Sequence, residues 1–169
     1  MDHVLTCLKD LKLRGNQVEF HIYGDGPKRV ELEQRSIAEE IPVKFHGRFH
    51  PKEASKIYQN VDVIVNYRKA NNVSEKVTPL KPLEALLHKK ALICSDVGGY
   101  REILNDSHAI FVEPDNPAAL GSAFLRLLKN PADFPDREVG FEFVRNERLW
   151  SANAKKYFSI YEKILENAK

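Results

Sequence analysis

Apolar positions along the chain follow two different periods. Near the start, Val4, Leu5, Leu8 and Leu11 recur every third or fourth residue, which predicts an amphipathic helix over 2–14. Further on, short apolar runs bounded by glycine or polar residues are typical of buried strands. The predicted strands cover 18–24, 42–47, 61–67, 91–95 and 108–112. Further helices are predicted after the turn GDGP and over 51–60, 79–88, 98–104 and 116–130, with a polar loop over 68–77.

The order of these elements predicts the fold class. Strands alternate with helices through most of the chain, and several strands are apolar on both faces, which is typical of a doubly wound α/β fold with a parallel sheet. Residues 134–169 carry no strand signal but two helical stretches, roughly 136–149 and 151–167. We therefore predict one α/β domain over 1–133 and a C-terminal extension whose helices pack on it. An α/β domain that opens with a helix has usually lost, or borrows, the strand before it, so we expect this chain to be a fragment without its first strand.

Composition narrows the possible functions. The 169 residues suffice for one domain with a sizeable core, and the net charge of +2 argues against a surface for nucleic acid. Cys7 and Cys94 lie in segments predicted to be a helix and a buried strand, without partners at metal-ligand spacing. This indicates a reducing, cytoplasmic environment. No apolar run approaches the roughly 20 residues that span a bilayer.

Four stretches fall at the carboxyl ends of predicted strands, where open parallel sheets bind ligands. They are Gly24-Asp25-Gly26-Pro27, Gly47-Arg48-Phe49, the loop over 68–83, and Asp96-Val97-Gly98-Gly99. Glycine lets a backbone approach a ligand closely, and helix N-termini favour phosphate. The same glycines also fit ordinary tight turns between strands and helices, so the residues alone leave both interpretations open.

The stretch VTPLKPLEAL combines a stiff loop with charged groups. Pro79 and Pro82 restrict the backbone, and the Thr78 hydroxyl is placed to cap the following helix. Lys81 offers a cation to a phosphate, and Glu84 can accept hydrogen bonds from the vicinal hydroxyls of a ribose. Such a charge-assisted bond contributes roughly 1.5–3 kcal/mol, whereas a glutamate that only complements the helix dipole contributes about 0.3–1 kcal/mol. Pattern alone slightly favours the helix-dipole role, because acidic residues are common in the first turn of helices.

Six motifs in order carry a resemblance to a known family. They are G-D-G-P, F-H-G, D-V-I-V, T-P-L-K-P-L-E-A-L, S-D-V-G-G-Y-R-E-I and F-V-E-P-D-N-P. From about residue 3 to residue 130 the chain closely resembles the C-terminal domain of retaining glycosyltransferases of the GT-B fold. The similar group is the glycogen-synthase-like and mannosyltransferase-like family 4, the glycosyl transferases group 1. This resemblance implies a Rossmann-like domain that binds the nucleotide half of a nucleotide-sugar.

The resemblance also implies roles for individual residues. Glu84 resembles the second glutamate of the family's E-x7-E motif, which holds the ribose hydroxyls. Arg48 and Phe49 resemble the wall that contacts the base, and Gly24 the glycine that lets the first strand end approach the nucleotide. The residues that resemble the diphosphate and sugar contacts are Thr78, Leu80 and Lys81.

Two departures from the family pattern stand out. The position eight residues before Glu84 is Lys76, and Glu75 is one residue further back, so Glu75 is our candidate for the catalytic glutamate that faces the donor sugar. The family's Arg and Lys that neutralise the diphosphate belong to the strand and helix that open the domain. Here Lys12 and Arg14 lie too far along the first helix to replace them.

The implied protein is a hexosyltransferase that retains anomeric configuration, needs no metal or other cofactor, and acts in bacterial polysaccharide or lipopolysaccharide synthesis. The implied partners are a nucleotide-sugar (UDP-, GDP- or ADP-linked) and a missing N-terminal acceptor domain, with no nucleic acid. The isolated chain is expected to be inactive. Lys155 and Lys156 leave open a peripheral contact with the inner face of the membrane.

Three other kinds of protein could share this order of strands and helices. A GT-B-fold nucleotide-sugar epimerase is disfavoured by T-P-L-K-P-L-E. A receiver domain is rejected because the strand over 61–67 ends in Val-Asn-Tyr instead of a phosphorylatable Asp. A degenerate, non-catalytic GT-B-like binding domain remains open because of the spacing of Glu75.

Overall fold

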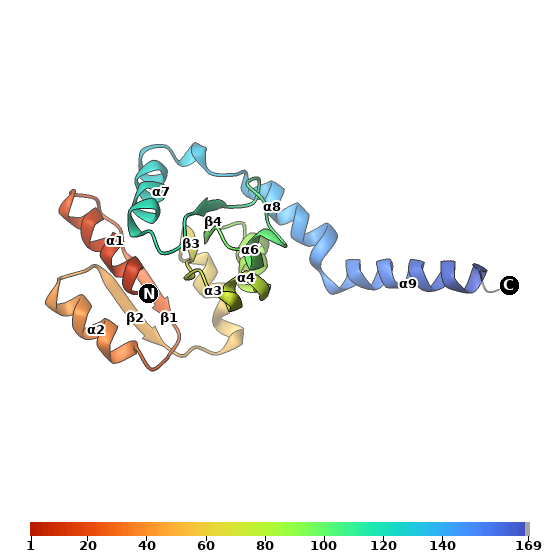
Figure 1. The fold of residues 1–169 in the computed structure, drawn as a ribbon, viewed down its shortest axis with the longest axis horizontal. Coiled ribbons are helices and arrows are strands. Elements are labelled where there is room, and N and C mark those ends of the chain that lie inside the picture. Colours follow the sequence, from red (N-terminus) through yellow and green to blue (C-terminus); the bar gives the residue numbers. More distant parts are fainter. Residues whose placement is uncertain (168–169) are drawn as a thin grey trace.

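Helices and strands alternate along residues 1–167, the part of the chain that the computed structural model describes (Figure 1). This order confirms the predicted α/β class. The first half comprises α1 (Asp2–Leu13), β1 (Phe20–Tyr23), α2 (Arg29–Ala38), β2 (Val43–Gly47), η1 (Pro51–Glu53), α3 (Ala54–Gln59) and β3 (Val63–Asn66). The second half comprises α4 (Asn72–Lys76), α5 (Lys81–Leu87), β4 (Ala91–Ser95), α6 (Gly98–Arg101), β5 (Ile110–Val112), α7 (Pro117–Lys129), η2 (Pro131–Asp133), α8 (Arg137–Phe143), η3 (Val144–Arg148) and α9 (Trp150–Asn167).

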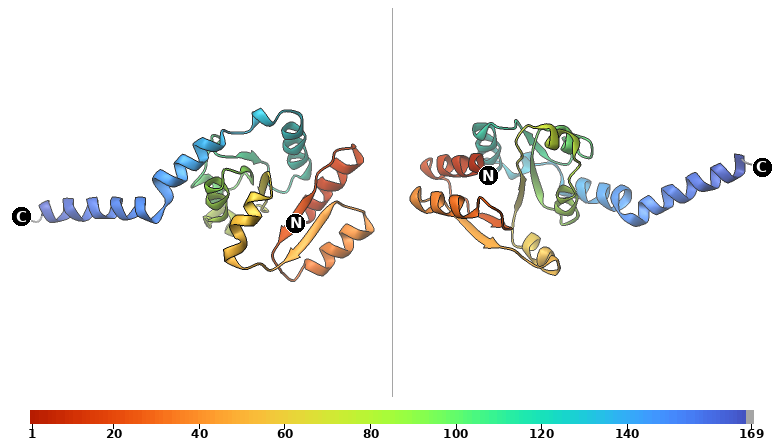
Figure 2. Two further views of the ribbon diagram at one scale, coloured as in Figure 1. Left: turned by 180° about the vertical axis from the view of Figure 1, so that it is seen from behind. Right: turned by 60° about the horizontal axis from the view of Figure 1, so that its bottom comes forward.

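The five strands form two parallel sheets. β1 pairs with β2 in one sheet, and β3, β4 and β5 form the other in that order. No strand of the described chain lies between β1 and β3, so the β1–β2 pair stands apart from the larger sheet (Figure 2). A groove of about 710 Å³ separates the two sheets and is lined by residues of both β1 and β3.

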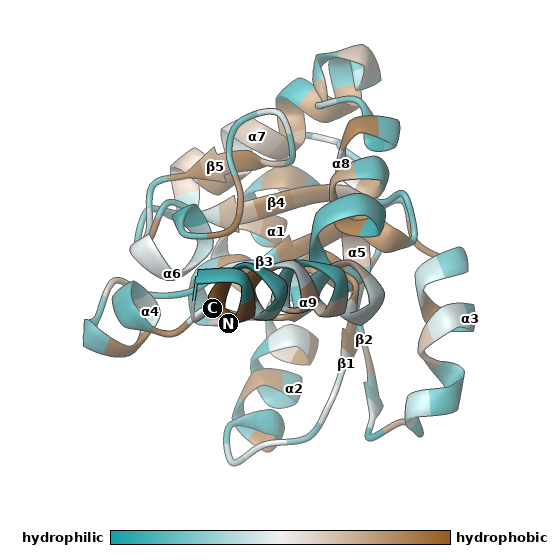
Figure 3. Ribbon diagram, turned by 90° about the vertical axis from the view of Figure 1, so that its right-hand side faces the viewer, coloured by the Kyte–Doolittle hydropathy of each residue, from teal (hydrophilic) through white to brown (hydrophobic). Residues whose placement is uncertain are grey.

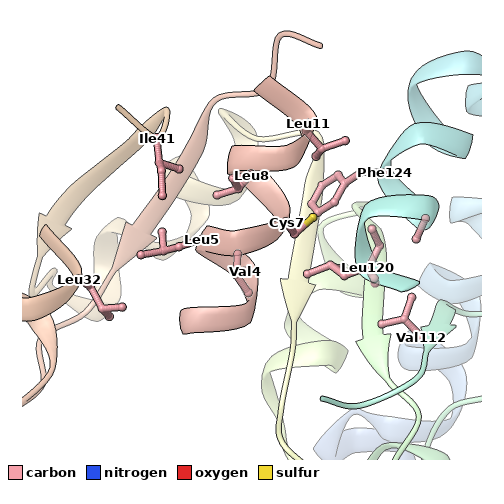
Figure 4. Close-up of a cluster of buried hydrophobic side chains, with 12 residues drawn as sticks. Val4, Leu5, Cys7, Leu8, Leu11, Leu32, Ile41, Val112, Leu120 and Phe124 are labelled. Atoms are coloured by element: carbon pink, nitrogen blue, oxygen red, sulfur yellow. The ribbon is translucent and has the colours of Figure 1, made fainter. Parts of the chain in front are cut away.

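The buried face of α1 packs into the space beside this groove. Leu5 and Leu11 are completely buried and Val4 and Leu8 nearly so, which explains the predicted apolar stripe (Figure 4). The helix has no side-chain N-cap, so packing rather than capping stabilises it. The same cluster includes side chains of α2, α7 and both sheets, among them Leu32, Ile93, Val112, Leu120 and Phe124. α1 therefore joins the two sheets through apolar contacts.

A second apolar cluster covers the opposite face of the larger sheet. It joins α5, α6 and η3 to β4, with Tyr100 at 2% exposure and Val144 at 3%. α8 approaches α5 closely, because a Cβ at Gly140 would lie 2.7 Å from Leu86 Cδ2. α8 and η3 therefore pack on the domain.

The last helix, α9, is not buried against the domain as α8 is. None of the residues in α9 is buried, and the helix extends away from the domain (Figure 1). Trp150, at its start, is 87% exposed. No helix in the described part of the chain combines the length and apolarity needed to cross a lipid bilayer.

One predicted loop contains a helix. The segment over 68–77 was predicted to be loop, but α4 forms within it. The Asn71 side chain accepts hydrogen bonds from the N–H groups of Val73 and Ser74, and the Ser74 hydroxyl accepts from the Asn71 N–H. This reciprocal cap stabilises a short helix whose polar composition gave no apolar period.

The role of α1 predicts a stability difference between two leucines of the same helix. Leu8→Ala is expected to lower the free energy of unfolding by about 2–5 kcal/mol, because it leaves a cavity between the sheets. Leu13→Ala, at a position that is 77% exposed, is expected to change it by less than about 0.5 kcal/mol. Urea unfolding of both variants provides the measurement, and equal effects would contradict this account of the core.

Candidate functional site

Backbone at the ends of β1 and β2 is open to a ligand. The Gly24 N–H donates to Gly47 O at 2.7 Å, which holds the two strand ends together. Gly24 has φ +135°, a conformation that favours glycine, and a Cβ there would meet no atom within 4 Å. The predicted close approach at Gly24 is therefore sterically free.

Arg48 and Phe49 follow β2 directly. The Arg48 side chain is 86% exposed, with Nε 3.5 Å from an Asp25 carboxylate oxygen. The Phe49 ring meets the Tyr23 ring edge-on at 5.9 Å, and Tyr23 stacks on His46 at 4.3 Å. The structure thus places the aromatic rings of Tyr23, His46 and Phe49 together at the ends of β1 and β2. Contact with a base stays a prediction.

The loop before α5 is held by buried prolines. Pro79 and Pro82 are both buried, whereas Leu80 and Lys81 between them are exposed. The N–H groups of Leu80 and Lys81 have no hydrogen-bond partner within residues 1–167. The predicted cap at Thr78 is wrong: Leu80 is the N-cap of α5 and provides no side-chain cap.

The Thr78 hydroxyl has a different partner. It donates to the Glu102 carboxylate at the end of α6. This bond ties the loop to α6 and leaves the helix start uncapped, so its free N–H groups are available to an anion.

Cationic side chains lie beside this loop. Arg68, which follows β3, donates from its backbone N–H to Ser95 Oγ at 2.7 Å, and its Nη1 lies 3.4 Å from Val77 O. Its guanidinium lies over the Tyr100 ring at 5.2 Å. Lys81 has no carboxylate within 4.0 Å among the described residues. Both cations are therefore without an acidic partner that would compete with a phosphate.

The two basic residues of α1 lie elsewhere. Lys12 Nζ donates to Glu40 O at 2.7 Å, and Arg14 Nε donates to Asp10 Oδ2 at 2.7 Å. These contacts are at the C-terminal end of α1, so neither side chain replaces the family's diphosphate cations. Arg68 is better placed, at the carboxyl end of a strand.

Glu84 has a partner that the sequence did not indicate. Its Oε2 accepts a hydrogen bond from Tyr58 OH at 3.1 Å, and the Tyr58 ring stacks on His88 at 4.6 Å. Burial and the negative charge of Glu84 raise the pKa of Tyr58, which keeps the hydroxyl protonated as a donor. Tyr58 therefore orients an exposed carboxylate whose second oxygen, Oε1, has no partner among residues 1–167.

Glu75 lies on α4 and contacts the start of α6. The two helices are neighbours (Figure 3). Its carboxylate accepts from the Gly98 N–H at 2.7 Å. A Cβ at Gly98 would lie 2.7 Å from Glu75 O, and one at Gly99 would collide with Val77 O and lie 2.6 Å from Ser74 O. The two glycines therefore permit the close packing of α4 on α6. Contact of Glu75 with a sugar is untested and stays a prediction.

The predicted site residues fall into two groups. Gly24, Arg48 and Phe49 belong to the smaller sheet, and Glu75, Thr78, Leu80, Lys81 and Glu84 to the larger sheet and its helices. No hydrogen bond or ion pair in the described chain joins one group to the other. The two halves of the candidate site are therefore positioned independently of any polar contact between them.

Across residues 1–167, no group of three or more His, Cys, Asp or Glu side chains is arranged to hold a metal ion. Cys7 and Cys94 are free and buried, and burial raises the pKa of Cys7 to about 12. Burial raises the pKa of the Cys94 thiol as well, so both thiols stay protonated near neutral pH.

Parallel strands, flanking helices and exposed loops at the carboxyl strand ends define a Rossmann-like α/β domain. The sequence model of the family "Glycosyl transferases group 1" matches residues 1–130. The chain belongs to this family, as its motifs predicted. No curated protein sequence matches it.

Solved structures share the fold at low sequence identity. A glycosyltransferase from Rickettsia africae is 19% identical with a TM-score of 0.72, covering 98% of this chain and 45% of that one. HepE from Anabaena, in complex with UDP and glucose, is 15% identical with a TM-score of 0.73, covering 95% and 44%. The C-terminal domain of LpcC, a group 1 family protein from Francisella tularensis, is 20% identical with a TM-score of 0.68, covering 86% and 77%. The chain thus spans less than half of the first two proteins and most of the isolated C-terminal domain.

The α4–α6 contact predicts a difference between two glycines. Gly99→Ala is expected to lower the free energy of unfolding by about 1–3 kcal/mol, because the new methyl group collides with backbone oxygens that cannot turn aside. Gly26→Ala, where a Cβ meets nothing within 4 Å, is the matched control and should change stability by less than about 0.5 kcal/mol. Urea unfolding compares the two, and a stable Gly99→Ala protein would show that α4 does not pack as described.

Proposed function

We propose that the chain is the donor-binding part of a glycosyltransferase that takes a sugar from a nucleotide-sugar and retains its anomeric configuration. The observation that carries this proposal is the α5 start, beside the cations of Lys81 and Arg68. Two backbone N–H groups there, at Leu80 and Lys81, have no hydrogen-bond partner in the part of the chain that the structure describes. Donors of this kind suit the two phosphates of a nucleoside diphosphate.

We assign the contacts with the nucleoside, its ribose and its base, to other residues of the candidate site. Glu84, oriented by Tyr58, presents its second carboxylate oxygen to the ribose hydroxyls. The aromatic wall at Phe49 and the exposed Arg48 lie at the end of the smaller sheet and take the base. UDP, GDP and ADP all offer a ribose and a diphosphate. UDP is the first choice because the similar HepE structure contains it.

The reaction follows from these contacts. As the glycosidic bond to the diphosphate breaks, negative charge grows on the departing phosphate oxygens, and Arg68 and Lys81 stabilise it electrostatically. We assign no step to a metal or other cofactor. The acceptor is bound by a domain that this chain does not contain, so the isolated chain binds donor but transfers nothing. Hexose transfer in bacterial polysaccharide or lipopolysaccharide synthesis, in the cytoplasm or at the inner membrane face, completes the proposal.

Glu84→Ala tests the ribose contact. Loss of the charge-assisted bonds, roughly 1.5–3 kcal/mol, is expected to weaken nucleoside diphosphate binding about 10- to 150-fold. Titration of the 169-residue chain with UDP, GDP and ADP, followed by amide shifts in NMR spectra, measures this and identifies the base. Glu162→Ala, which removes an exposed carboxylate from α9, is the matched control. Equal affinities of the two variants would remove Glu84 from the site.

A non-catalytic binding domain is the second candidate, favoured by the hydrogen bond that holds Glu75 against Gly98. If the chain is part of a transferase, Glu75→Ala should weaken binding of UDP-glucose or another nucleotide-sugar while the affinity for UDP stays unchanged. If both affinities stay unchanged, Glu75 serves only the α4–α6 junction and the non-catalytic candidate is preferred. Circular dichroism of the variant controls for loss of fold.

A further inference from the structure

Two histidines and a tyrosine share one face of the β1–β2 sheet. Strand alternation places His21 and Tyr23 on this face of β1, and His46 of β2 lies against both. The pairing register shifts just before Tyr23, which pairs with Gly47, so no residue of β1 lies opposite His46. An irregularity of this kind re-aims the side chain beside it. The His46 ring is nearly parallel to its neighbours, with centroids 5.0 Å from His21 and 4.3 Å from Tyr23.

One hydrogen bond joins the two histidines. His21 Nδ1 lies 2.9 Å from His46 Nε2. The other ring nitrogen of His21, Nε2, lies 2.5 Å from Glu19 Oε1, and Lys44 Nζ is 2.8 Å from the second oxygen of the same carboxylate. The bonds from Lys44 and His21 lower the pKa of Glu19, so this side chain stays an ionised acceptor where histidines titrate. His21 Nε2 therefore carries a hydrogen whether the ring is neutral or charged.

These contacts determine how many protons the pair can hold. Neutral His21, with its hydrogen on Nε2, accepts at Nδ1, and His46 donates from Nε2. One additional proton is compatible with this bond, because on His21 it only exchanges donor and acceptor. A second additional proton places hydrogens on both facing nitrogens, and neither nitrogen can then accept. The bond between the rings is therefore lost when both histidines are cations.

The pair supports an aromatic ring that lies outside the strands. Phe49 follows β2 and meets the Tyr23 ring edge-on at 5.9 Å, and Tyr23 in turn stacks on His46. Within residues 1–167, neither the N–H nor the carbonyl of Phe49 forms a hydrogen bond. The orientation of Phe49 therefore depends on ring packing that continues back to the two histidines.

Other charged groups around this sheet are not bonded to the pair. α2 packs against the opposite face, where its Arg29 forms an ion pair with Glu33 at 2.8 Å. No ion pair or side-chain hydrogen bond of the described residues joins another charged group to either ring. The groove beside His21 is lined from other elements by two uncharged residues of α3 and by two charged residues, namely Ile57, Asn60, Asp62 and Arg137.

We propose that His21 and His46 are positioning residues, whose shared hydrogen bond holds Tyr23, and through it Phe49, in the orientation that receives the base of the nucleotide. The contact with the base rests on the proposed function, whereas the support of Phe49 does not. Because the bond is lost when both rings are charged, Phe49 is held at neutral pH and released below about pH 6, where ordinary histidines take up a proton.

An NMR titration of the 169-residue chain without nucleotide, between about pH 8 and pH 5, tests the support of Phe49. Its amide and ring signals are expected to shift together with the second protonation of the pair, which the carbon-bound imidazole protons report. His46→Gln replaces the titrating ring by an amide that can donate to or accept from His21, so the step at Phe49 should disappear. His108→Gln, which removes a histidine stacked on Phe143 instead, is the matched control and should keep the step.

Three results would overturn this support. In the first, the Phe49 signals stay constant while both histidines titrate. In the second, the two histidines titrate independently, so that the midpoint of His21 does not move in the His46→Gln protein. In the third, the step at Phe49 persists in that variant, which means that another group controls the ring.

UDP binding, measured by calorimetry at about pH 7.5 and pH 5.5, tests the consequence for the base. The affinity of the unchanged chain should fall about two- to tenfold more than that of His46→Gln, the effect of losing one hydrogen bond. Protonation of the diphosphate is common to both proteins and cancels in this comparison. His46→Leu, which cannot form the bond, should bind UDP more weakly than His46→Gln at both values.

The two measurements separate this proposal from the proposed function. Equal falls in the two proteins would show that the pair does not position a contact with the base. A step at Phe49 in a chain that binds no UDP at either pH would support the role of the histidines in holding the ring, and it would overturn both the base contact and the proposed nucleotide site.

Discussion

Apolar packing around α1 holds the two sheets in one molecule. Backbone hydrogen bonds do not join β1 to β3 in the described chain, so the relative position of the sheets depends on Leu5, Leu8 and Leu11 packed against side chains of both sheets and of α7. Such packing is strong in total but not directional, since it rewards burial of area rather than one geometry. Strand pairing would add direction. The core is therefore well packed, but no directional bond between β1 and β3 fixes the position of one sheet relative to the other within the described residues.

The candidate site is divided between the same two sheets. The open backbone at Gly24 and the aromatic wall at Phe49 belong to the smaller sheet, whereas the α5 start and Glu84 belong to the larger one. Within the larger half, order is high because Thr78, Glu75 and Glu84 are each held by a named partner on another helix. A nucleoside diphosphate that contacts both halves would therefore bind more tightly when the two sheets are held in one relative position, because binding then costs less conformational entropy.

The sequence predicted those features that depend on local pattern. α1 and β4 were found from apolar spacing and from a continuous apolar run, and the motif order identified the family. Periodicity reports which residues are buried but not which strands pair, so the division into two sheets could not be predicted. α4 was missed because its stability comes from the Asn71 cap and not from an apolar stripe. The partners of Glu75 and Glu84 lie 23 and 26 residues away in the chain, beyond the reach of any local signal.

The only tryptophan of the sequence, Trp150, lies at the start of α9, where its side chain is 87% exposed. The tryptophan fluorescence of this protein therefore comes from one indole exposed to water, with long-wavelength emission and access to a soluble quencher. Whatever covers the exposed aromatic residues of α9, including Tyr157, Phe158 and Tyr161, will shift the emission to shorter wavelength. The chain thus carries an optical reporter for its C-terminal helix that is separate from the candidate site.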